Sequence, residues 1–164
     1  MKHVIILSLI LLMSVTKVCA DTPSTTLELE FVMKLRVTLG SVFTLGETPK
    51  GRRTVIPITG GTFEGPLLKG TILSGGADYQ MATLDGKHTS LEAIYTLKTD
   101  DGYYIHVRNR GIISNRQEPY FRAAPQFEAP EDSPYAWLNE AIFVCAPEFS
   151  ELFKGIVLNV WKVK

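Results

Sequence analysis

The chain has 164 residues, of which 45% are hydrophobic, and its 17 lysines and arginines balance 17 aspartates and glutamates. This balance argues against the basic surface that nucleic-acid binding requires, so nucleic acid is not expected among its partners. The length and hydrophobic fraction predict a folded domain with a core of its own.

Residues 1–20 are predicted to be a cleaved secretory signal peptide, because a mostly apolar run at 4–15 is followed by Val18 and Ala20 at the positions typical of a cleavage site. The run is too short to span a bilayer, so no stable membrane insertion is expected, and a lipid anchor on Cys19 fits the flanking residues poorly. We therefore expect an exported protein, periplasmic or secreted, whose mature part is one domain at 21–164.

The first predicted strand runs from Leu27 to Val37, where every odd position is apolar and the even positions are polar apart from Val32. This period of two indicates one buried face and one solvated face. Further strands, separated by glycine, proline or Asx turns, are expected at 53–59, 65–73, 78–83, 91–99, 103–111, 120–128 and 156–163.

A short helical turn is expected from Pro134 to Asn139, with Ser133 as its cap. Consecutive short strands with turns between them predict an all-β fold, namely a closed or nearly closed antiparallel up-and-down β-barrel with one short helix. Such a barrel leaves no open edge and encloses room for about one small ligand.

The alternation also predicts which side chains point into the barrel. Tyr95 shares a face with Leu91 and Leu97, so its hydroxyl is expected inside, where it needs a partner. Asn109 shares the apolar face of the next strand and is expected inside, or else it only caps a turn near Gly111.

Asp78 and Gln80 share one strand face directly after the glycine pair Gly75-Gly76. A carboxyl group that points into an apolar barrel is a weaker acid, which suits a general acid or base. The alternative is a turn aspartate that bonds its own backbone. The glycine pairs, Gly60-Gly61 included, predict turns or bulges, because no helix follows them to bind phosphate.

The strand at 120–128 has an apolar face and a polar face, and the sequence leaves open which of them lines the lumen. Tyr120 beside Arg122 on the polar face would make a clamp for a carboxylate or an enolate. His88 and His106 are isolated, so no metal site and no cofactor are expected. Cys145, the cysteine left in the mature chain, is predicted to be a buried small side chain rather than a nucleophile.

Seven motifs follow one another along the chain, namely GETPKGRR (46–53), IPITGGTFEGP (56–66), LKGTILSGGADYQ (68–80), YTLKTDDG (95–102), VRNRG (107–111), YFRAAPQFE (120–128) and YAWLN (135–139). Taken together, they resemble the DUF3237 family, also called the UPF0311 proteins, from about Leu29 to the end of the chain. Ser74 and Tyr79 stand where the family usually has proline and tryptophan. The resemblance implies a single antiparallel β-barrel with a central cavity and brings no settled activity.

These motifs contain more polar residues than a plain β scaffold needs, so we expect a site for a small molecule. The first hypothesis is a cofactor-free enzyme that performs acid/base chemistry of the isomerase, cyclase or hydro-lyase type on a small polar or aromatic compound. The expected catalytic residues are Asp78, Arg122 and Tyr95, and the expected substrate-binding residues are Gln80, Asn109, Tyr120, Glu128 and Trp137. The alternatives are a lipocalin-like binding protein for a small hydrophobic ligand and a structural envelope protein. The sequence determines neither the ligand nor the oligomeric state.

Overall fold

A computed structural model describes residues 26–116, 118–150, 152 and 155–164, so the predicted signal peptide at 1–20 lies outside the described residues. The described residues form ten strands and one 3₁₀ helix, η1 (Ala136–Glu140), between β8 and β9. The strands are β1 (Leu29–Leu39), β2 (Phe43–Thr48), β3 (Gly51–Glu64), β4 (Lys69–Ile72), β5 (Gly76–Ala82), β6 (His88–Thr99), β7 (Tyr104–Ser114), β8 (Tyr120–Glu128), β9 (Phe143–Ser150) and β10 (Gly155–Val163).

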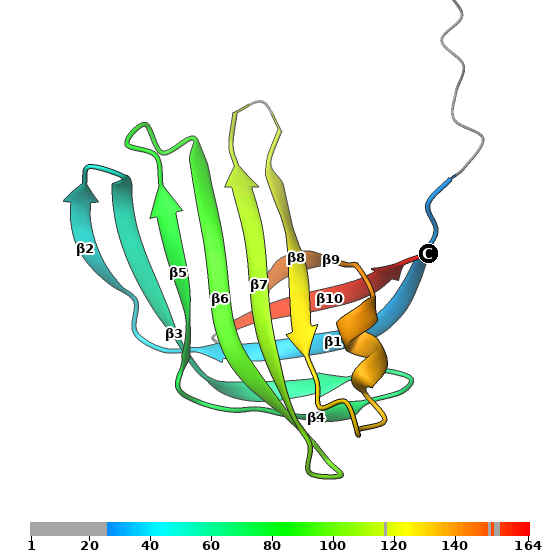
Figure 1. The fold of residues 1–164 in the computed structure, drawn as a ribbon. Coiled ribbons are helices and arrows are strands. Elements are labelled where there is room, and N and C mark those ends of the chain that lie inside the picture. The colour runs from blue at the N-terminus through cyan, green and yellow to red at the C-terminus, as the bar shows by residue number, and fades with distance from the viewer. Residues whose placement is uncertain (1–25, 117, 151, 153–154) are drawn as a thin grey trace, which may run out of the picture.

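The strands close into an antiparallel barrel (Figure 1). From β1 the ring runs through β10, β9, β8, β7 and β6 to β4 and β5, then to β3, which pairs back onto β1. Because β4 and β5 share one place between β3 and β6, the ring has eight positions. β2 extends the first half of β3 as a hairpin. The predicted closed up-and-down barrel with one short helix is therefore confirmed.

A bulge in β3 lets that strand serve both halves of the ring. Opposite β1, Gly61 pairs with Val37 and Ile58 pairs with Leu39. Between these two pairs β3 advances by three residues and β1 by two. The extra residue reverses the alternation, because side chains of a strand change face at every residue. Phe63 on one side of the bulge and Ile58 on the other are therefore both buried. The glycine pair Gly60-Gly61 lies at this bulge, and both residues have positive φ angles.

The stretch from Leu73 to Gly75 is a kink between β4 and β5, which both run antiparallel to β3. Gly75 has a φ of 105° and donates its N–H to the carbonyl of Ile58. A Cβ atom on Gly76 would lie 2.5 Å from the carbonyl oxygen of Ile94, so β5 can approach β6 only with glycine at this position. The predicted turn or bulge is confirmed, and it starts the strand that carries Asp78.

One end of the barrel is filled by apolar side chains and covered by η1, whose Leu138 is 1% exposed. Phe127 and Phe143 pack edge to face there, with ring centroids 5.0 Å apart. The β5–β6 and β7–β8 hairpins lie at the opposite end (Figure 1). The core therefore closes one end of the barrel and leaves its other half for a cavity.

Some local predictions need correction. β2 and β9 were not expected, and the helix begins at Ala136, after the Ser133 hydroxyl accepts the N–H of Tyr135 in the preceding turn. Val32 breaks the alternation of β1 because a register shift lies between Phe31 and Met33, so that Val32 is buried too.

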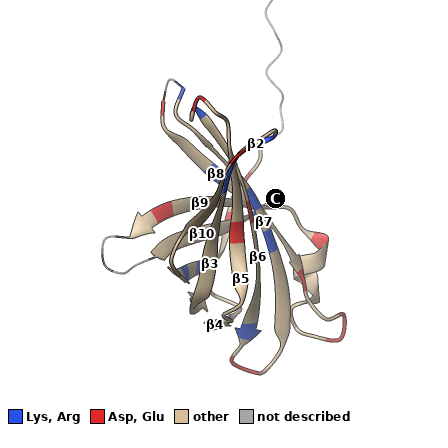
Figure 2. Cartoon of the chain, turned by 90° about the vertical axis from the view of Figure 1, so that its left-hand side faces the viewer, with Lys and Arg blue, Asp and Glu red and all other residues tan. Residues whose placement is uncertain are grey.

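The described part of the chain contains no helix long and apolar enough to cross a membrane. Many charged residues lie near strand ends and loops (Figure 2).

Replacement of Gly76 by alanine should destabilise the barrel by about 1–3 kcal/mol, the usual cost of forcing an extra methyl into a packed site. The new Cβ would collide with the backbone of Ile94 and with Tyr95. Urea unfolding measures the loss, and Ser74→Ala in the exposed part of the same turn is the matched control. Equal stabilities of the two variants would contradict the close approach of β5 and β6.

Candidate functional site

The open half of the barrel contains a cavity of about 70 Å³. This space is large enough to hold more than one water molecule. Each of the eight ring positions contributes two or three alternate side chains, the position shared by β4 and β5 through β5 alone, as expected for a barrel interior. The lining residues are Val37, Leu39, Ile56, Ile58, Asp78, Gln80, Leu91, Ala93, Tyr95, Asn109, Gly111, Ile113, Phe121, Ala123, Pro147, Phe149, Ile156 and Leu158.

The polar side chains of the lining come from three neighbouring strands. Asp78 and Gln80 lie on β5, Tyr95 on β6 and Asn109 on β7. Asp78 pairs with Ala93, and Ala93 pairs with Asn109, so the three residues form one row across the sheet. Residues opposite one another in a sheet point to the same face. The structure therefore brings together Tyr95 and Asn109, which strand alternation placed inside, with Asp78 and Gln80, which it placed on one shared face.

Asp78 is half-buried, and its two carboxyl oxygens have different surroundings. Oδ2 accepts a hydrogen bond of 2.7 Å from Nε2 of Gln80, whereas Oδ1 is buried and has no partner among the described residues. Loss of water around the group raises the pKa of Asp78, and the bond from Gln80, together with the backbone N–H of Glu92, which makes no hydrogen bond to Oδ1, offsets part of this effect. The carboxyl group is therefore poised to hold or release a proton at Oδ1.

Asn109 is only 6% exposed, and its Oδ1 also lacks a partner among the described residues. Its amide interacts with the thiol of Cys145, which is 1% exposed. Burial raises the pKa of Cys145 to about 12, so this cysteine is a protonated core residue, as the sequence predicted. Asn109 therefore lines the cavity wall, and the alternative that it only caps a turn near Gly111 does not hold.

Tyr95 lines the inner part of the cavity and is 4% exposed. Burial raises the pKa of its phenol above the ordinary value of 10.0. The hydroxyl group therefore keeps its proton and can act as a hydrogen-bond donor.

The prediction that Arg122, Tyr120 and Glu128 share a site with Asp78 needs correction. Phe121 and Ala123 line the cavity, so the intervening side chains of β8 point outward and are exposed. Arg122 does lie over the Tyr120 ring, 5.7 Å from its centroid, but on the outside of the barrel. The physical reason is pairing with β7, which sets the apolar face of β8 beside Asn109.

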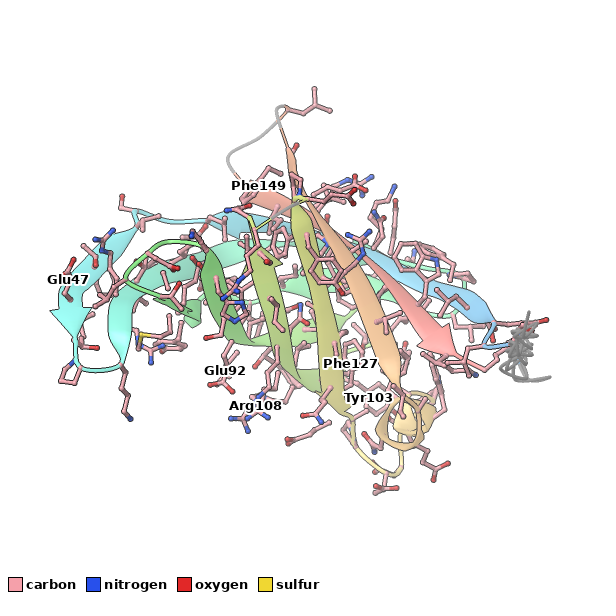
Figure 3. All side chains as sticks on the ribbon, turned by 90° about the horizontal axis from the view of Figure 1, so that it is seen from above. Glu47, Glu92, Tyr103, Arg108, Phe127 and Phe149 are labelled. Carbon is pink, nitrogen blue, oxygen red and sulfur yellow. The ribbon has the colours of Figure 1, made fainter. Side chains whose placement is uncertain are left out.

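The outer surface of the same wall holds its own ion pair. Arg108 donates to Glu92 at 2.7 Å, and Figure 3 shows the two side chains on the outer side of β6 and β7. Both groups are partly solvated, so the pair adds little to stability. The Glu92 and Arg108 side chains of β6 and β7 therefore point away from the cavity.

Trp137 is also separate from the cavity. It lies on η1 at the filled end, where its ring packs 6.2 Å from that of Phe143 and Lys162 lies 5.9 Å from its centroid. The expected substrate-binding role therefore has no geometric support from the cavity. Within the described ranges, no group of three histidine, cysteine or acidic side chains could hold a metal ion.

Sequence reasoning missed the aromatic pair beside the mouth of the cavity. The rings of Phe121 and Phe149 lie 6.0 Å apart, and Phe149 is 74% exposed. The signal was present in β9, where Phe143, Cys145, Pro147 and Phe149 alternate with other residues. The continuous apolar stretch from Ala141 to Cys145 masks that alternation in the sequence.

Comparisons with known proteins agree with this geometry. The model of the DUF3237 family, described as a protein of unknown function, matches residues 27–163. A UPF0311 protein of Rhodopseudomonas palustris is 36% identical over 134 residues, which cover 73% of this chain and 86% of that protein. A β-barrel-like protein of Acinetobacter baumannii superposes with a TM-score of 0.77 at 33% identity, over 88% of this chain and 100% of that one.

A crystal structure of an enzyme from Penicillium herquei superposes with a TM-score of 0.70, over 88% of this chain and 100% of that one. Its sequence is 23% identical to this chain, so the likeness is one of fold alone.

The raised pKa of Asp78 predicts a pH-dependent stability difference between the wild type and Asp78→Asn. Between the ordinary carboxyl value of 3.8 and the raised folded value, the folded state binds more protons than the unfolded chain. The stability of the wild type relative to Asp78→Asn should therefore be greatest below pH 3.8 and fall as the pH rises through the folded pKa. Urea titrations of both proteins across this window measure the difference.

Asp85→Asn is the control, because the pKa of Asp85 is lowered and its effect on stability changes with pH in the opposite direction. The bond from Thr83, followed by that from the backbone of Lys87, lowers the pKa of this exposed carboxyl group. The wild type should gain stability relative to Asp85→Asn as the pH rises through that lowered value. Parallel curves for the wild type and Asp78→Asn would show that the Asp78 carboxyl is not desolvated.

Proposed function

The chain belongs to the DUF3237 family, and for this member we propose that it binds a small, mostly apolar molecule in the barrel and transfers a proton on it through Asp78. The observation that carries the proposal is the Oδ1 atom of Asp78, which is buried in an apolar cavity and has no partner among the described residues. A buried polar atom without a partner is costly, and such costs are typical of functional sites.

Gln80 defines which atom of Asp78 reacts. Its amide donates to Oδ2, so the proton of the neutral acid belongs on Oδ1. Ionised, Oδ1 accepts a proton from the bound molecule, and the resulting acid can return that proton to a different atom. A carboxyl pKa raised toward the working pH favours both steps.

Tyr95 and Asn109 are the groups available to stabilise charge. The protonated hydroxyl of Tyr95 and the amide of Asn109 can donate to an oxygen on which negative charge develops when Asp78 removes a proton. Isomerisation, cyclisation and hydration or dehydration all proceed by such proton transfers. Cys145 takes no part as a nucleophile, because its buried thiol stays protonated.

A second candidate function is ligand binding without catalysis. The observation that favours it is the composition of the cavity wall, in which four of eighteen residues are polar. In this case Asp78 would only orient the ligand. The predicted signal peptide supports the further proposal that either function operates outside the cytoplasm.

Hydrogen exchange on β-tetralone tests the catalytic proposal, because this neutral aromatic ketone carries acidic C–H groups next to its carbonyl. The wild type should speed the exchange of these protons in heavy water by about 100-fold or more over buffer, the usual effect of a positioned acid or base. Asp78→Asn should lose this acceleration and still bind the ketone. Proton NMR follows the exchange, and line broadening of the ketone signals follows binding.

Arg122→Gln is the matched control, because it changes an exposed residue of the outer face. It should retain both the exchange activity and the binding of the wild type. Binding of β-tetralone without exchange, in the wild type as in Asp78→Asn, would reject catalysis and leave the binding function.

A further inference from the structure

We propose that the natural ligand is a neutral compound that offers two hydrogen-bond donors, such as hydroxyl groups at opposite ends of an apolar ring system, and that anions are rejected. The inference rests on the proposed function, because it names the class of molecule that would occupy that same cavity. It differs from the carboxylate clamp that the sequence suggested.

The first argument is the pair of unmatched acceptors. Oδ1 of Asp78 and Oδ1 of Asn109 are the two buried side-chain polar atoms that lack a partner among the described residues, and both residues line this one cavity. In the free protein, water can serve both atoms. A ligand that displaces this water must supply donors in its place or leave the acceptors unpaired.

The second argument is their placement. Asp78 and Asn109 lie on β5 and β7, directly across β6, with only the methyl group of Ala93 between them. Neighbouring strands are about 4.8 Å apart, so the two backbones are roughly 10 Å apart. This arrangement favours an apolar ring system with one hydrogen-bond donor on each side.

Small residues line the cavity beside the row formed by Asp78, Ala93 and Asn109. Gly111 follows Asn109 on the same face, and a Cβ atom there would lie 2.9 Å from Cβ of Ala123. The cavity is lined by Ala93, Gly111 and Ala123, so no long side chain projects between or beside the two acceptors. A flat apolar molecule can therefore lie against β6, β7 and β8.

The third argument is charge. The described residues that line the cavity include no lysine, arginine or histidine, and Arg122 is exposed on the outer face. A bound anion would lose its water without gaining a cation. Once ionised, Asp78 would also repel it. A neutral ligand with hydrogen-bond donors avoids both the uncompensated loss of hydration and the repulsion by ionised Asp78.

Fluorescence titration with three naphthalene probes tests the inference. The probes are a naphthalenediol with one hydroxyl on each ring, its dimethyl ether, and the hydroxynaphthoate in which a carboxylate replaces one hydroxyl. At neutral pH the wild type should bind the diol about tenfold or more tightly than the ether, because methylation removes both donors. It should bind the hydroxynaphthoate still more weakly.

Asn109→Leu probes the second acceptor with a side chain of similar size. It removes a buried acceptor without a partner, so the variant should fold at least as stably as the wild type, which urea unfolding checks. Its preference for the diol over the ether should fall several-fold. Gln126→Leu, on the exposed face of β8, should keep the wild-type preference.

Equal binding of the diol and the ether, tightest binding of the hydroxynaphthoate, or failure of all three probes to bind would each overturn the inference. Proton exchange on β-tetralone is measured separately. A protein that prefers the diol but shows no exchange would keep this inference and lose the catalytic proposal. A protein that exchanges tetralone protons but does not prefer the diol would do the reverse.

Discussion

The pairing of β1 with the second half of β3 is the contact on which the rest of the structure depends, because it closes the sheet into a barrel. β3 pairs with four strands, namely β1, β2, β4 and β5. Its bulge makes this possible by turning side chains on both sides of Gly60-Gly61 inward. Pro57, which has no N–H group, lies between the segment paired with β2 and the segment paired with β1.

Closure creates the low-dielectric interior that gives Asp78 its character. On an open sheet the carboxyl group would be solvated, and only the bond from Gln80 would distinguish its two oxygens. Inside the barrel one oxygen is held and the other is unmatched, opposite a second unmatched acceptor on Asn109. The apolar core at the η1 end supplies stability that can offset these unpaired polar atoms.

Much of the barrel could be predicted from alternation alone, because the period of two is a local property of an extended chain. It placed Tyr95 and Asn109 inside and Asp78 on one face with Gln80, and all four residues line the cavity. It left open which face of β8 lines the lumen, and the roles expected from the family motifs for Tyr120, Arg122, Glu128 and Trp137 fell on residues outside the cavity. Aromatic and charged residues in a family motif look functional in sequence, whereas their direction depends on the neighbouring strand.

The sequence by itself determined the class of fold, most strands and the set of side chains that share each strand face. These follow from backbone geometry over a few residues. Only the tertiary structure decided which face of β8 is the lumen, that a bulge brings both halves of β3 inward, and that Asp78 and Asn109 lie across Ala93 in one row. The reason is that register and closure pair residues far apart in the chain, and local alternation contains no information about that pairing.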